Sequence, residues 1–163
     1  MAGMNGHADD IPSLRRILRE CRVIAVVGLS AHWHRPSYFA AKYLLEHGYR
    51  VIPVNPQYAQ VLGQRCYASL REIPGKVDMV DVFRREADVP PVAEDAIAIG
   101  AKVLWQQLGL RHEAAAARAR AAGLATVMDR CVKIEHGRLF GGLNWVGVNT
   151  RVVSARRPSW TPY

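Results

Sequence analysis

The chain has few cysteines, no long apolar run and no leader-like N-terminus. Its three cysteines, Cys21, Cys66 and Cys131, are odd in number and lie far apart in a chain of 163 residues. This usage argues against a disulfide framework and favours a reducing compartment, the cytoplasm. No apolar stretch approaches the ~20 residues that a membrane-spanning helix needs. Residues 1–10 lack an apolar segment after a charged start, so we expect no signal peptide.

Metal-ligand spacings and nucleic-acid motifs are also missing. There is no CxxC or HxxxH pair, and His32 and His34 flank Trp33 without a third ligand, so the sequence predicts no metal site. The formal net charge is +8. Charge of this sign fits nucleic acid, but the basic residues are dispersed and neither a zinc finger nor an RNA-binding aromatic motif accompanies them. We therefore interpret the charge as a solvated basic surface or as attraction for a phosphate-rich small ligand.

Apolar runs and helical spacings alternate along the chain. Half of the residues are apolar and 22% are charged, which fits one globular domain. Apolar runs predict five buried strands, over residues 23–29, 50–54, 79–83, 102–106 and 125–128. Helical spacing and helix-end signals predict four helices between and before them, over residues 11–20, 37–47, 90–100 and 112–122. We expect an α/β three-layer sandwich with a five-stranded, mostly parallel sheet.

The alternating pattern starts at residue 11 and breaks after Cys131. We predict a flexible N-terminal tail over residues 1–10, one domain over residues 11–136 and a C-terminal arm over residues 137–163. Glycines and aromatic residues replace the periodic pattern in the arm. Two interpretations stay open for it, packing on the domain or a neighbouring subunit, and disorder beyond Arg156.

The loop after the first strand carries the clearest ligand signal. The strand ends in the segment VVGLSA, and a helix follows shortly after it. This order brings backbone N–H groups at the start of a helix to the end of a strand, where they favour a phosphate. The dinucleotide fingerprint G-x-G-x-x-G needs three glycines, but after Gly28 the other two positions hold Ser30 and Trp33. The loop therefore predicts a phosphate site that differs from that of NAD-binding proteins.

Polar and basic side chains follow the other strands at the same edge of the sheet, where ligands of open parallel sheets bind. An NAD site has an acidic residue after the second strand for the ribose, and Asn55 stands there instead. Gly28 can also serve the turn alone, Ser30 a helix N-cap and Arg84 a solvated surface. No nucleophile–base pair is evident at this edge. The residues alone thus indicate a phosphate-bearing ligand other than NAD.

Five segments, in this order, resemble a known family. They read VVGLSAHWHRPSY, LLEHGYRVIPVNP, VDMVDVFRR, AIAIGAKVLWQQLG and AGLATVMDRCVKIE. Together they resemble the small stand-alone CoA-binding proteins of bacteria, which are similar to the CoA-binding domain of the succinyl-CoA synthetase alpha subunit. The resemblance spans about residues 11–136, and the arm resembles a longer version of the same family. It implies a Rossmann-like fold with coenzyme A as its ligand.

The resemblance also implies which residues contact CoA. Those of the turn that holds the CoA phosphates are Gly28, Ser30, Ala31, Arg35, Pro36, Ser37 and Tyr38. Asn55 and Pro56 match the end of the second strand, near the adenosine. Phe83 and Arg84 match the end of the third strand, near the pantetheine or the pyrophosphate. Gln106, after Trp105, matches the motif of the fourth strand.

Ligase activity does not follow from the resemblance. In the synthetase a second domain carries the phosphorylated histidine, and no segment of this chain matches it. We expect a CoA-binding or acyl-CoA-binding protein without a catalytic centre, serving as a carrier, a sensor or the partner of an acyl-CoA enzyme. The arm is the predicted contact for a second copy or a partner enzyme. The alternatives are an NAD(P)-linked oxidoreductase on the same fold and an interaction scaffold that uses the basic, aromatic tail.

Overall fold

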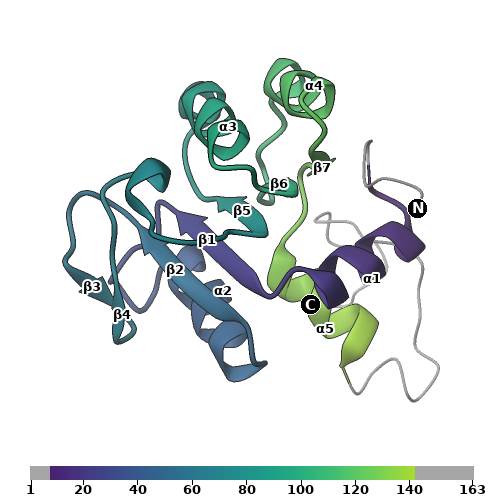
Figure 1. The fold of residues 1–163 in the computed structure, drawn as a ribbon. Helices are drawn as coiled ribbons and strands as arrows, with labels where there is room; N and C mark the ends of the chain where they lie inside the picture. The colour runs from purple at the N-terminus through teal and green to yellow at the C-terminus, as the bar shows by residue number, and fades with distance from the viewer. Residues whose placement is uncertain (1–7, 142–163) are drawn as a thin grey trace.

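A computed structural model describes residues 8–141, and predictions for residues 1–7 and 142–163 lie outside that range. The central sheet has the order β2-β1-β5-β6-β7, and all of its neighbouring strands are parallel (Figure 1). Its strands are β1 (Val23–Val27), β2 (Arg50–Val54), β5 (Met79–Val82), β6 (Val103–Gln106) and β7 (Ala125–Val127). The predicted five-stranded parallel sheet is therefore confirmed.

Helices cover both faces of this sheet. They are α1 (Ile11–Glu20), α2 (Pro36–Glu46), α3 (Val89–Ala98), α4 (Glu113–Ala121) and α5 (Val132–Phe140). Helices α3 and α4 lie on one face and α1, α2 and α5 on the other (Figure 1). Because both faces are buried, the strands are apolar on both sides, which explains the continuous apolar runs. The three-layer α/β arrangement is confirmed.

Local signals explain where the helices start. The Asp10 carboxylate accepts a hydrogen bond from the backbone N–H of Ser13 at 2.9 Å and so caps α1. Leu14, Ile17 and Leu18 form the buried stripe of that helix. Helices α2 and α3 each have proline in the first turn, where a missing N–H has no cost. These bounds agree with the predicted helices to within two residues.

Helix α5 is a difference from the sequence analysis, which predicts no helix after residue 128. The buried face of α5 includes Glu135, which is fully enclosed. Its carboxylate lies 2.8 Å from the Arg138 guanidinium and 3.7 Å from that of Arg130. The inward face carries this glutamate between Val132 and Leu139, so its apolar stripe is too sparse to reveal the helix. It also continues across the predicted boundary at residue 136.

Two further elements also differ from the expectation. Strands β3 (Gln60–Val61) and β4 (Gln64–Arg65) form a small antiparallel hairpin. At the other end of the domain, Ala8 is buried and its N–H donates to the Thr126 carbonyl at 3.0 Å. The last residues of the predicted tail therefore lie against β7. Short 3₁₀ turns occupy Leu70–Glu72 and Glu86–Asp88.

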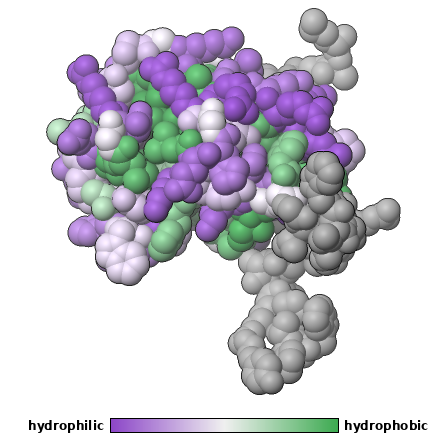
Figure 2. Space-filling model, turned by 90° about the horizontal axis from the view of Figure 1, so that it is seen from below, coloured by the Kyte–Doolittle hydropathy of each residue, from purple (hydrophilic) through white to green (hydrophobic). Residues whose placement is uncertain are grey.

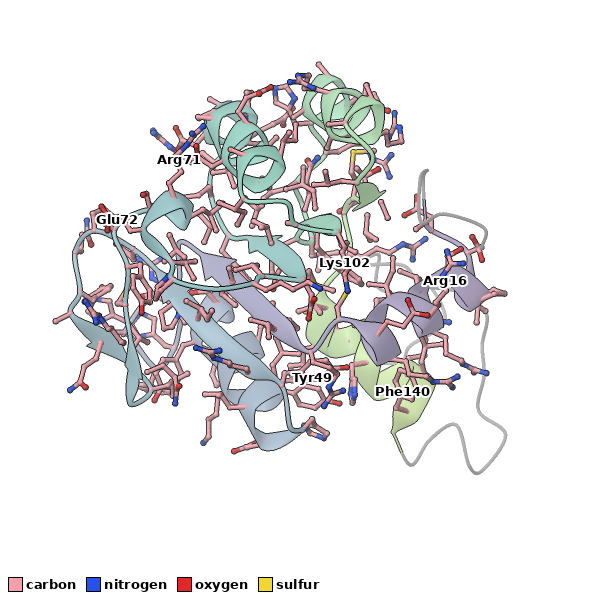
Figure 3. The ribbon with its side chains drawn as sticks, viewed as in Figure 1. Arg16, Tyr49, Arg71, Glu72, Lys102 and Phe140 are labelled. Carbon is pink, nitrogen blue, oxygen red and sulfur yellow. The ribbon has the colours of Figure 1, made fainter. Side chains whose placement is uncertain are left out.

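The amino edge of the sheet is polar and well bonded. Tyr49 and Lys102, labelled in Figure 3, immediately precede β2 and β6. The carboxylate of Asp78 accepts hydrogen bonds from the backbone N–H groups of Arg22 and Val23 at 2.9 and 3.0 Å. Lys102 lies 3.3 Å from the same carboxylate. This edge is thus closed by internal contacts, in contrast to the opposite edge.

The side of the molecule that bears α1, α2 and α5 is partly apolar on its surface. In Figure 2, green apolar side chains lie among purple hydrophilic ones on this side. Exposed apolar residues from α2 and α5 are Phe39, Ile134 and Phe140. No helix within residues 8–141 is long and apolar enough to cross a membrane.

Candidate ligand-binding site

A cavity of about 1160 Å³ opens at the carboxyl edge of the sheet. The loops after β1, β2, β5 and β6 form its floor, and the first turns of α2 and α5 form its walls. The volume exceeds the roughly 300–1,000 Å³ of a site for a drug-sized molecule, so it suits a long ligand. Eight of the twelve predicted site residues line it, namely Gly28, Ser30, Arg35, Pro36, Ser37, Asn55, Phe83 and Arg84.

Gly28 is required by the backbone at this point. Its φ is +87°, and a Cβ atom there would lie 2.1 Å from the carbonyl oxygen of Phe83. Only glycine fits such a left-handed position against a neighbouring strand end. The loop after β1 therefore packs directly against the residue that follows β5. Gly28 thus serves the fold as well as the site.

Two serines fix the loop between β1 and α2. The Ser37 hydroxyl accepts a hydrogen bond from the Ser30 N–H at 3.0 Å, and the Ser30 hydroxyl accepts one from the His32 N–H at 3.1 Å. Pro36 occupies the first turn of α2, so it has no N–H to satisfy. The start of α2 therefore faces the cavity in a fixed loop, with both hydroxyl protons left to donate.

Asn55 joins the loops after β1 and β2. It is 6% exposed, and its amide nitrogen donates to the Leu29 carbonyl at 3.1 Å. Its side-chain oxygen accepts from the Gln57 N–H at 3.0 Å. A carboxylate at this position has no proton to donate to Leu29. The acidic residue of an NAD site is thus replaced by an amide that this loop geometry requires.

The lining of the cavity is strongly cationic. Four cationic side chains line it, Arg35, Arg84, Arg85 and Lys133, against one carboxylate, Asp88. Arg85 lies 2.9 Å from that carboxylate. Neither Arg35 nor Arg84 has an ion pair with any residue of the described range. Two guanidinium groups are therefore available to a phosphate beside the loop after β1.

Four predicted site residues do not line the cavity. Ala31 is exposed, Tyr38 packs against the core and Pro56 is exposed. Gln106 is fully buried, and its amide both donates to the His112 carbonyl and accepts from the His112 N–H, at 3.2 and 2.7 Å. The structure therefore places all four residues behind or beside the cavity.

A family of proteins matches most of the chain. A family model described as "CoA binding domain" matches residues 22–137. The chain belongs to the CoA-binding domain family. All of the residues that line the cavity lie within the matched range. The resemblance to CoA-binding proteins is therefore confirmed.

Relatives of the CoA-binding domain occur alone and inside larger enzymes. An uncharacterized Bacillus subtilis protein, YneT, is 41% identical over 123 residues, which are 76% of this chain and 91% of that protein. The structure of a hypothetical protein from Pyrococcus horikoshii is 43% identical, with a TM-score of 0.79 over 81% of this chain and 93% of that one. An ADP-forming acetate–CoA ligase of Archaeoglobus fulgidus is 31% identical over 56% of this chain but only 14% of its own length.

One wall of this CoA-binding domain's cavity is absent from the predicted site. The first turn of α5 contributes Cys131, Lys133 and Ile134, and the segment after β6 contributes Gln107 and Leu108. Burial raises the pKa of the Cys131 thiol, although backbone N–H groups of Ile134 and Lys133 oppose that effect. Gln107 and Leu108 directly follow β6, so the order of strands already places them at this edge. Without α5 in the prediction, nothing indicated that Lys133 and Ile134 meet the loop after β1.

Proposed function

We propose that this protein binds coenzyme A or an acyl-CoA in the cavity and acts as a carrier, a sensor or the partner of an acyl-CoA enzyme. The observation that carries the proposal is the mixed lining of the cavity, which combines guanidinium groups with apolar side chains. Arg35 and Arg84 line it without ion pairs in the described range. Helices α2 and α5 add the apolar side chains of Phe39 and Ile134, and the ammonium of Lys133 lies 5.8 Å from the centre of the Phe39 ring.

This mixed lining fits the chemistry of CoA. The ligand has a phosphorylated adenosine and a pyrophosphate at one end and a long pantetheine arm at the other. The arginines, the Ser30 and Ser37 hydroxyls and the start of α2 favour the phosphates. The apolar wall suits the methylene groups of the arm. In this orientation the adenosine lies near Asn55, as the resemblance implies.

The chemistry of the cavity thiol supports binding rather than catalysis. Cys131 is a nucleophilic side chain in the cavity wall, and burial raises the pKa of its thiol. A thiol with a raised pKa is a poor nucleophile, because the thiolate is the reactive form. The proposed function therefore gives Cys131 no nucleophilic role.

Titration calorimetry with CoA, acetyl-CoA, NAD and NADP tests the proposal. CoA or acetyl-CoA should bind, and NAD and NADP should not. Arg84→Ala should weaken CoA binding by about 1–3 kcal/mol, because a charged hydrogen bond to phosphate is lost. Arg118→Ala is the matched control, since Arg118 lies on α4 and pairs with Glu94. Tight binding of NADP without binding of CoA would contradict the proposal and favour an oxidoreductase.

A further inference from the structure

A buried polar pair lies under the floor of the cavity. Asp81 in β5 is fully enclosed, with Val26 of β1 and Trp105 of β6 as its neighbours in the sheet register. Its oxygen Oδ1 accepts a hydrogen bond from Nε2 of Gln107 at 2.6 Å. Its other oxygen, Oδ2, has no partner within residues 8–141. Burying a carboxyl group with one oxygen unpaired lowers the stability of the fold.

The pair fixes the orientation of the Gln107 amide. Gln107 is 4% exposed and lines the cavity, so the small part of it that is reachable faces the cavity. Because Nε2 is bonded inward to Asp81, the oxygen Oε1 is the end left for a ligand. No residue of the described range donates to that oxygen. Burial also raises the pKa of Asp81 to about 8, which favours the uncharged form of the carboxyl.

The surroundings of Gln107 define what it can accept. Phe39, Leu108 and Ile134 line the same cavity, and each is about half exposed, at 45%, 44% and 53%. One fixed acceptor among apolar side chains suits a chain of methylene groups that carries an N–H donor. It does not suit a phosphate, which has acceptors only.

We propose that Gln107, held by the buried carboxyl of Asp81, accepts a hydrogen bond from an amide N–H of the pantetheine arm. This inference rests on the proposed function, because it takes CoA as the ligand. Gln107 is then the residue that distinguishes a ligand with an amide-bearing arm from a nucleotide alone. Asp81 is a positioning residue that acts through Gln107.

The test compares two ligands by titration calorimetry, CoA and 3′-phospho-ADP, which lacks the arm. Gln107→Leu should weaken CoA binding about fivefold to tenfold, as expected for one lost hydrogen bond. It should leave 3′-phospho-ADP binding unchanged. The matched control is Gln106→Leu, which changes the neighbouring residue on the opposite face of the sheet and should not alter the ratio of the two affinities. Equal losses for both ligands, or no loss for CoA, would overturn the inference.

The positioning role of Asp81 has its own readout. Asp81→Asn keeps an acceptor for Gln107 Nε2 and should keep the CoA to 3′-phospho-ADP affinity ratio, whereas Asp81→Leu should lower that ratio.

Where a variant fails to fold, the wild-type protein is titrated with a CoA analogue whose pantetheine amides are esters. The analogue should bind more weakly than CoA. If CoA and 3′-phospho-ADP bind the wild type equally well, the inference about Gln107 fails, but the proposed phosphate site is supported. If neither ligand binds, both the inference and the proposed function fail.

Discussion

The buried carboxyl of Asp81 predicts that the protein loses stability as the pH rises through neutrality. Burial raises the pKa of this group from an ordinary 3.8 to about 8, with the hydrogen bond from Gln107 opposing the change. The folded protein therefore keeps this proton until about pH 8, whereas the unfolded chain releases it near pH 4. Between these values the folded state binds one more proton. The free energy of unfolding consequently falls as the pH rises.

The size of this loss follows from the two pKa values. Each pH unit between them costs about 1.4 kcal/mol, so a difference of about four pKa units amounts to about 6 kcal/mol. In the Asp81→Asn variant this position no longer titrates, so its free energy of unfolding should not show this fall with pH. In urea unfolding of the ligand-free proteins, the stability of the variant relative to the wild type should grow by about 1.4 kcal/mol per pH unit from about pH 5 to pH 8.

Asp78, which precedes the same strand, provides the matched control. Burial favours its neutral form, but the N–H groups of Val23 and Arg22 and the Lys102 ammonium outweigh burial and lower the pKa of Asp78. Its stabilising effect is present above its ordinary pKa of 3.8 and is lost only as the pH falls below it. Asp78→Asn should therefore differ from the wild type by a constant amount from about pH 5 to pH 8. If the Asp81→Asn difference is equally constant, Asp81 is ionised in the folded protein and the reasoning is refuted.

Three further substitutions test the site and the fold. Gly28→Ala should cost about 2–5 kcal/mol in urea unfolding, because the new methyl group meets the Phe83 carbonyl at a left-handed backbone position. Asn55→Asp should lower the free energy of unfolding by about 1–3 kcal/mol and weaken CoA binding in calorimetry, because the Leu29 carbonyl loses its donor and the cavity gains a negative charge. Glu135→Leu should cost about 3–5 kcal/mol in the same unfolding assay, since the half-buried Arg138 loses the carboxylate it pairs with and Arg130 keeps only Asp9 among the described residues. A loss below about 1 kcal/mol in any of these assays would contradict the corresponding contact.

The sequence was sufficient to predict the sheet because its strands have a simple pattern. Residues 23–27 and 50–54 are almost wholly apolar, as expected for strands that are buried on both faces. The hairpin of β3 and β4 has no such pattern. Its turn places Leu62 and Gly63 at φ values of 52° and 71°, and leucine is an unusual choice for the first of these positions. Propensity alone does not reveal a turn of this kind.

Half of the cavity could be predicted for a similar reason. The phosphate end is built from loops that directly follow strands, so the order of strands and helices is enough to bring Gly28, Asn55 and Arg84 together. The other end depends on α5, whose inward face is held by a buried glutamate. That glutamate pairs with Arg130 and with Arg138, one turn further along the helix. Because it stands between Val132 and Leu139 on the inward face, it interrupts the apolar stripe by which a helix is recognised in a sequence.

The placement of Gln106 and Gln107 follows from the alternation of side chains in a strand. Trp105 lies on the face of α1, α2 and α5, so Gln106 points to the face of α4, and Gln107 returns to the first face. Asp81 in β5 is paired with Trp105 in the register and therefore shares its face. A shift of one residue in the sequence thus separates an amide that bonds to the backbone of His112, just before α4, from one that reaches the cavity. The two glutamines are adjacent and chemically identical, and they differ only in the face of the sheet to which each side chain points. The ligand test therefore compares substitutions at both positions.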